Sequence, residues 1–327
     1  MFATLLGPLP RPPLAASAVP EEILVAIMRA QEEAGLEPLI DSGFGIGDSP
    51  AERWRATAAL TDRPVKGALL GPFSAGRAAA VGRTDADRPD ADRAGRLAAP
   101  DAGAWADAAL AVVETLHADL LALASAGCAY VEIHEPAAIE IGTDQDRRAL
   151  FRDLHRRLLD GVGGTHLSLA ITGGNADAAG VETLLAAPYA SLAIDLIAGP
   201  DNWRLAVATP GDRGIVAGAM SSLAGSDDGP EVLVWAAGYA ASTGRRGPGR
   251  VGLASASSLA HLPWDVALRK LERLGEAARL ADLPPAERRR RLDPRAVDIR
   301  SAALGRYEPR PPSAVRRRRR HRPADLT

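Results

Sequence analysis

The sequence predicts an α/β fold, and within that class a (β/α)8 TIM barrel in a single domain. Short apolar segments alternate along the chain with longer segments of helical periodicity. Several of the short segments are apolar without interruption, as expected for strands that are buried on both faces of a parallel sheet. The runner-up is an open doubly wound sheet, which is disfavoured because no Gly-x-Gly-x-x-Gly motif follows the first strand.

The predicted elements alternate in the order that a barrel requires. The helix over 20–33 begins with Pro-Glu-Glu and ends near Gly35, which are typical start and stop signals. The strands are predicted at 2–6, 38–41, 65–70, 130–134, 166–171, 191–196, 214–217 and 251–254. The later helices are predicted at 105–126, 145–159, 178–186, 231–241 and 263–280.

Residues 1–283 are predicted to form the barrel, and two segments depart from its pattern. Residues 74–102 contain almost no large apolar side chains, so we predict a flexible insertion above the barrel mouth. Residues 284–327 are rich in Arg and Pro, so we predict a solvated, disordered tail. A lid formed by the insertion, and anion binding by the tail, are the less favoured interpretations.

The composition excludes several functional classes. The formal net charge is −2 at pH 7, so nothing in the overall charge points to nucleic acid or to a membrane surface. The single cysteine, Cys128, excludes an internal disulfide and any metal site built from paired cysteines. We find no secretory signal and no run of about 18 apolar residues, so we expect a cytoplasmic protein without a membrane span.

The most informative motif is Tyr-Val-Glu-Ile-His-Glu-Pro-Ala at 130–137, where an apolar strand ends in two ionisable residues. In a barrel, the carboxyl ends of the strands carry the functional side chains. Because neighbouring strand residues point to opposite faces, only one of His134 and Glu135 enters the barrel. If His134 is that residue, it acts as a general base or an anion-binding group, or it is a hydrogen-bonded histidine that fills the mouth.

Several motifs, taken in order, resemble the cobalamin-independent methionine synthase family. The segments at 4–12, 31–43 and 66–72 are similar to its first three strand motifs. Glu135-Pro136-Ala137 is similar to its Asp-Glu-Pro-Ala motif, and 257–263 is close to its Cys-Ser-Leu-Leu-His-Val-Pro motif. The matches cover residues 2–282, so the resemblance implies that family's barrel and methyl transfer from a methylfolate to a thiol.

The resemblance also implies a zinc ion that binds the thiol as thiolate, and here the chain departs from the family. The family's His-x-Cys ligands fall near Ala170-Ile171-Thr172, its Glu ligand at Asp195 and its last Cys at Ser257. The two acidic positions that would hold a substrate ammonium are His134 and Phe44, so the resemblance implies that His134 is the residue that points into the barrel. We therefore expect no resident cofactor and no zinc, with His134, Asp195 and His261 as a less favoured metal site.

We predict a divergent methionine synthase-like methyltransferase that binds a small folate- or thiol-type ligand at the barrel mouth. The alternatives are a non-catalytic binding or partner protein, and an acid–base enzyme that uses His134 and Asp195. We expect a small-molecule partner and neither specific nucleic acid nor membrane.

The predicted catalytic residues are His134 and Asp195, and the predicted substrate-binding residues are Arg11, Asp41, Glu135, Asn175, Ser257 and His261. We also place Ser221 and Ser222 at the mouth.

Overall fold

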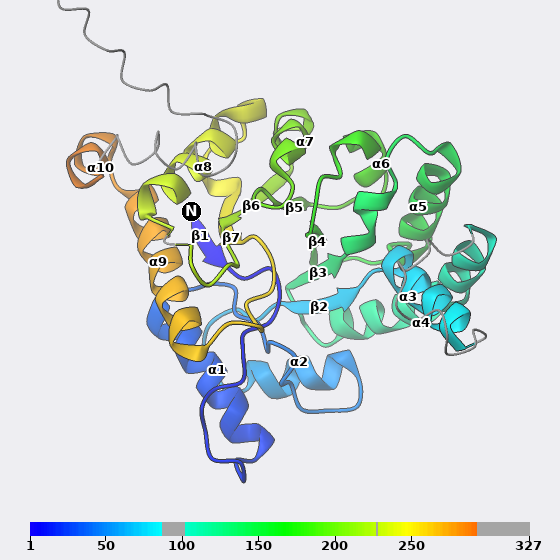
Figure 1. The fold of residues 1–327 in the computed structure, drawn as a ribbon, viewed down its shortest axis with the longest axis horizontal. Coiled ribbons are helices and arrows are strands. Elements are labelled where there is room, and N and C mark those ends of the chain that lie inside the picture. Colours follow the sequence, from blue (N-terminus) through cyan, green and yellow to red (C-terminus); the bar gives the residue numbers. More distant parts are fainter. Residues whose placement is uncertain (87–101, 227, 293–327) are drawn as a thin grey trace, which may run out of the picture.

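The computed structural model describes residues 1–86, 102–226 and 228–292 (Figure 1). Its strands lie inside a ring of helices, as the alternation of apolar and amphipathic segments predicts. The described residues form seven strands in one sheet, in the order β1-β7-β6-β5-β4-β3-β2, and every paired strand is parallel. The strands are β1 (Phe2–Thr4), β2 (Gly67–Leu70), β3 (Tyr130–His134), β4 (His166–Ile171), β5 (Ser191–Asp195), β6 (Gly214–Met220) and β7 (Val251–Ser255).

One of the eight predicted strands, at 38–41, does not form, so the prediction of a closed eight-stranded barrel is correct only in part. The segment lies between the edge strands β1 and β2 and makes an isolated parallel bridge between Leu39 and Val65. Its hydrogen bonds on the β1 side are from Glu37 N to the Ala3 carbonyl, at 2.7 Å, and from Thr4 Oγ1 to the Pro38 carbonyl, at 2.8 Å. Pro38 has no N–H to donate, which interrupts a regular ladder at this point.

The helices begin and end close to the predicted positions where amphipathic periodicity is strong. Helix α1 begins after Val19 and ends at a left-handed Gly35, as the sequence indicates. The predicted helix over 178–186 is only one turn, α6. The helices of eight residues or more are α1 (Pro20–Ala34), α2 (Pro50–Ala58), α3 (Pro72–Ala86), α4 (Ala102–Ser125), α5 (Gln145–Leu158), α8 (Pro230–Ser242) and α9 (Trp264–Asp282). The shorter ones are α6 (Val181–Leu184), α7 (Trp203–Ala208) and α10 (Pro285–Arg291).

Both segments predicted to be flexible or disordered are partly helical. Residues 74–86 belong to α3, and the alanines of this segment favour a helix more strongly than they favour a loop. Helix α3 packs against α4, where a side chain at Gly76 would overlap the backbone of Ala109. Residues 285–291 of the predicted tail form α10. The rest of both predictions, 87–101 and 293–327, lies outside the described residues.

Helix α4 is the one described helix that is long and apolar enough to cross a membrane by length and composition. No such segment is predicted from the sequence. In the fold, α4 packs between α3 and α5 and buries Trp105, Val113, Leu120 and Leu123. An apolar face of this kind also suits a helix that covers a barrel.

Candidate functional site at the barrel mouth

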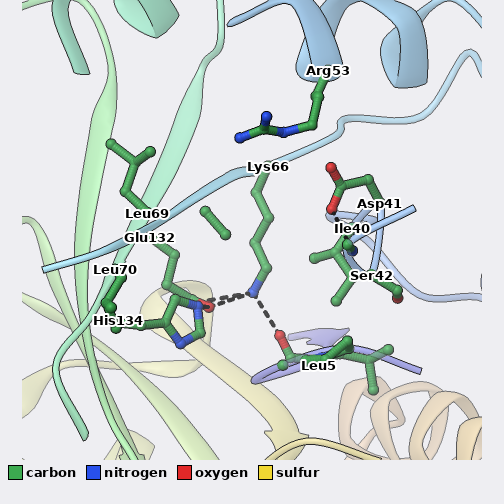
Figure 2. A pocket seen from close by; sticks show the side chains of 14 residues that line it. Leu5, Ile40, Asp41, Ser42, Arg53, Lys66, Leu69, Leu70, Glu132 and His134 are labelled. Carbon is green, nitrogen blue, oxygen red and sulfur yellow. Dashed lines mark hydrogen bonds and ion pairs between the residues drawn. The ribbon is translucent and has the colours of Figure 1, made fainter. Parts of the chain in front are cut away.

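A cavity of about 350 Å³ opens at the carboxyl ends of β1, β2 and β3 (Figure 2). Ionisable side chains from three parts of the chain line it, and they are Asp41, Arg53, Lys66, Glu132 and His134. Parallel α/β folds place ligand sites at this end of the strands. The cavity is therefore our candidate functional site.

A buried ion pair between Lys66 and Glu132 lies at the base of this cavity. Lys66 Nζ is 3.0 Å and 2.9 Å from the two carboxylate oxygens of Glu132 and donates to the Leu5 carbonyl oxygen at 2.7 Å. The two residues are 3% and 0% exposed. Three acceptors around one nitrogen match the three protons of an ammonium group, so the geometry favours the charged form of Lys66.

His134 extends this network toward solvent. Its Nε2 lies 2.9 Å from Glu132 Oε1, and its side chain is 20% exposed. Burial opposes ionisation of Glu132, but Lys66 and His134 outweigh it and hold the pKa of that carboxyl at about 2. Burial lowers the pKa of Lys66, and the attraction of Glu132 opposes that shift. Because Glu132 is ionised, Nε2 of His134 carries the proton, and Nδ1 is the basic nitrogen of the neutral ring.

Sequence reasoning missed Lys66 and Glu132, although the signal was present. Successive strand residues alternate between faces, so Glu132 must share the inward face of β3 with His134. A glutamate within an apolar strand demands a partner, because an unpaired buried charge is very costly. Lys66, the charged residue immediately before β2, supplies it.

The loop after residue 40 and helix α2 form the other wall of the cavity. Asp41 accepts a hydrogen bond from Gly43 N at 3.0 Å, and Ser42 adopts a left-handed φ of 53°. The hydroxyl of Ser42 is buried and has no hydrogen-bond partner among the described residues. Arg53 also faces the cavity from α2, and the one hydrogen bond of its guanidinium found in the described part is a 3.5 Å contact with the Asp48 carbonyl. This wall thus offers a carboxylate and a guanidinium to a ligand.

Glu135 does not lie at the mouth, so its predicted placement there is wrong. It points to the opposite face of β3, where its oxygens accept from Phe73 N at 3.0 Å, Ser74 N at 2.8 Å and Ser74 Oγ at 2.6 Å. His155 Nε2 lies 3.1 Å from Oε1, and Glu135 is fully buried. Its negative charge at the first turn of α3 satisfies amide groups that have no partner within the helix.

Asp195 is buried at the end of β5, and backbone groups occupy both of its oxygens. Oδ1 accepts from Ile197 N and Ala198 N, each at 2.8 Å, and Oδ2 accepts from Gly173 N at 3.0 Å. No contact with His134 is found in the described part of the chain. These bonds favour a positioning role, holding the loops after β4 and β5, over the catalytic role that the sequence suggested.

The structure does not bring the remaining predicted site residues into the cavity. Arg11 and His261 are exposed outside it, and Asn175 is exposed and exchanges hydrogen bonds with Asp201. Ser257 Oγ donates to Ser222 Oγ at 2.9 Å, and Ser221 Oγ accepts from Leu223 N. Of the predicted set, His134 and Asp41 alone line the cavity.

The side chains present do not fit the zinc site that the resemblance implies. The described residues contain no cluster of three His, Cys, Asp or Glu side chains arranged to hold a metal ion, and His134, Asp195 and His261 are not brought together. Ala170 and Ser257 stand at two expected ligand positions, and neither is a good zinc ligand at neutral pH. At a third position stands Asp195, whose carboxylate already accepts hydrogen bonds from three backbone amides.

Comparison with solved structures identifies the fold. A B12-independent methionine synthase from Shewanella, solved in complex with selenomethionine, matches with a TM-score of 0.64 and 13% identity, over 85% of this chain and 96% of that one. The chain has the fold of the cobalamin-independent methionine synthases. A putative vitamin-B12 independent methionine synthase from Listeria monocytogenes matches with a TM-score of 0.58 and 15% identity, over 85% of this chain and 97% of that one. A methyltransferase from Methanosarcina mazei matches with a TM-score of 0.57 and 13% identity, over 85% of this chain and 93% of that one.

Sequence comparison supports the same relationship, and the resemblance to the cobalamin-independent methionine synthases is confirmed. Two 5-methyltetrahydropteroyltriglutamate–homocysteine methyltransferases, from two strains of Rhodopseudomonas palustris, are each 29% identical over 212 residues, or 58% of this chain. The chain spans about a quarter of the length of these curated relatives, since the match covers 25% of them. No protein-family model matches the sequence.

Proposed function

We propose that the protein is a methionine synthase-like methyltransferase that transfers a methyl group to a small thiol at the barrel mouth without zinc. The observation that carries the proposal is the Glu132–His134 pair on the cavity wall, at 2.9 Å. The methyl donor that the relatives' names suggest is a methylated folate. Because the match covers a quarter of those relatives, donor and acceptor are both part of the proposal.

His134 acts as the proton acceptor for the thiol. A thiol is a weak nucleophile until it is ionised, and with no fitting zinc ligands a neutral imidazole is the group on this wall that is able to take its proton. Glu132 is a positioning residue, which holds the proton on Nε2 and stabilises the imidazolium that forms. The sulfur then attacks the methyl carbon, the carbon–nitrogen bond of the donor breaks, and the electron pair stays on that nitrogen, which takes up a proton.

The Lys66–Glu132 pair supports His134 in this role. One carboxylate contacts both Lys66 and His134, so the lysine compensates the buried charge of Glu132 while the imidazole of His134 lines the cavity. Arg53 and Asp41 face the same cavity from its other wall and supply opposite charges for the ends of a polar acceptor. This supports binding of a small polar thiol in preference to an apolar one.

The test is methyl transfer from methyltetrahydrofolate to thiols by metal-depleted protein, with and without added zinc. We expect transfer that zinc does not enhance and that falls at least tenfold in His134→Gln. His261→Gln is the matched control, because His261 is an exposed histidine outside the cavity. A transfer rate that depends on zinc, or an equal loss in both variants, contradicts the proposal.

Binding is measured separately from catalysis by the shift in melting temperature with the same thiols and folates. Stabilisation by these ligands is expected, because anything that binds only the folded state raises its stability. If neither ligand class stabilises the protein, the site is not a methyltransferase site.

A further inference from the structure

A second cavity, of about 620 Å³, opens at the opposite end of the barrel from the candidate site. Five strands contribute their first residue to its wall, and these are Phe2, Tyr130, His166, Ser191 and Gly214. We call it the basal cavity. Its volume lies in the range of small-molecule sites, and its wall is mainly apolar and aromatic with a few polar groups, as such sites are.

The basal cavity exists because the inward residues of this part of the barrel are small. A barrel interior is ordinarily filled with large branched side chains. Here Ser168, Ala170 and Ala193 occupy inward positions of β4 and β5, and Gly252 lies beside the ring of Phe2 with no room for a side chain. The space left by these residues is open at the amino ends of the strands.

The cavity wall includes a pair of stacked rings. Tyr130 and His166 lie with their centroids 4.7 Å apart and their planes at 12°, and His166 Nε2 is 2.8 Å from Ser191 Oγ. Burial lowers the pKa of His166 and raises the pKa of Tyr130 well above its ordinary value, so both rings are neutral at pH 7. A neutral, flat wall of this kind favours an aromatic ligand.

Three hydroxyl groups lie together at the inner end of the cavity. Tyr130 Oη and Ser168 Oγ are buried, and hydrogen bonding by the hydroxyls of Ser168 and Ser191 offsets part of the rise in the pKa of Tyr130. Because each hydroxyl can both donate and accept, this cluster offers hydrogen bonds to a polar substituent of a ligand.

The rim of the cavity carries two carboxylates and one guanidinium. Glu37 and Asp212 are exposed, and no partner for either carboxylate is found among residues 1–86, 102–226 and 228–292. Arg250 is exposed as well, but its Nη1 donates to the Gly211 carbonyl oxygen at 3.1 Å. The rim therefore favours a cation over an anion.

We propose that the basal cavity is a second ligand site, which takes a small aromatic molecule with a polar ring substituent and a cationic end. The ring lies against Tyr130 and His166, its substituent faces the inner hydroxyls, and its charge lies at the rim beside Glu37 and Asp212. The site is separate from the methyltransferase proposal, because none of its lining residues lines the mouth cavity.

Calorimetric titration with tyramine and with 3-(4-hydroxyphenyl)propionate tests the proposal, since the two share a phenol and differ in the charge of the tail. We expect tyramine to bind at least tenfold more tightly than the propionate. Gly249→Trp should weaken tyramine at least tenfold, because Gly249 lines the cavity and a side chain there meets no atom within 4 Å. Gly238→Trp is the matched control on the surface of α8, where space is equally open.

The location is checked by the imidazole NMR signals of His166, which should move on addition of tyramine to the wild type and not in Gly249→Trp. No binding of tyramine at millimolar concentration overturns the proposal. Equal affinity for the propionate overturns the assignment of a cationic ligand, and binding that Gly249→Trp leaves unchanged overturns the assignment to this cavity.

Discussion

His134 Nε2 lies 2.9 Å from Glu132 Oε1, and the same carboxylate holds Lys66 Nζ at 3.0 Å. One buried glutamate thus joins a fully buried ammonium to a histidine that reaches solvent. The arrangement places a titratable group on the wall of the mouth cavity while its charge partner stays ionised.

Glu132→Gln should destabilise the protein by about 3–5 kcal/mol, because it leaves the ammonium of Lys66 buried without a carboxylate. The measurement is urea unfolding at pH 7. The double variant Lys66→Met/Glu132→Gln should recover much of the loss, since it removes the unpaired charge as well. A single variant as stable as the wild type would show that the pair is not buried as described.

Acid should weaken the fold through Glu132. Its pKa in the folded protein is about 2, below the ordinary value of 4.5, so the unfolded chain binds the proton more readily. The stabilisation is complete above pH 4.5 and is lost as the pH falls toward 2, and it amounts to about 3 kcal/mol for this shift. Between pH 5 and pH 2, the stability of Lys66→Met/Glu132→Gln should therefore fall less than that of the wild type.

Glu135→Gln should destabilise α3 by about 1–3 kcal/mol, because the carboxylate that accepts from Phe73 N and Ser74 N loses its charge and one acceptor oxygen. Hydrogen exchange of the amides in the first turn of α3 should accelerate. Ser74→Ala removes the hydroxyl alone and should have the smaller effect. Unchanged exchange in Glu135→Gln would argue that another group satisfies these amides.

Asp195→Asn should cost about 1–3 kcal/mol, since one amide oxygen cannot replace two carboxylate oxygens that accept three backbone bonds. Asp201→Asn is the matched control, because Asp201 is at the surface, and its effect should stay within about 0.5 kcal/mol. Thermal unfolding of the two variants measures the difference. Equal stability of both would remove the positioning role of Asp195.

The local sequence pattern was sufficient to predict the strands that are buried on both faces of the sheet. The boundaries predicted for β3 and β4 agree with the structure, because mainly apolar runs bounded by turn residues define them. The pattern failed at 38–41, where a segment of similar composition contains a proline and makes one bridge only. It also failed at 74–86, where alanine and glycine were taken for a loop although α4 provides a surface on which they pack.

The candidate site was predicted less completely than the fold. The family resemblance implied the inward orientation of His134, which lines the cavity. Alternation along β3 then places Glu132 on the same face, and applying it would have found the centre of the network. Arg53 was not predicted at all, because its presence in the cavity depends on the packing of α2, a helix that the sequence analysis did not include.

By itself, the sequence determined most of the alternation of strands and helices and the resemblance to the methionine synthases, since both reside in local runs of residues. Only the tertiary structure decided that Glu132 pairs with Lys66, 66 positions away, and that Glu135 serves the first turn of α3. The physical reason is register. The pairing of Leu70 with His134 across β2 and β3 sets which charges meet, and no local periodicity encodes that alignment.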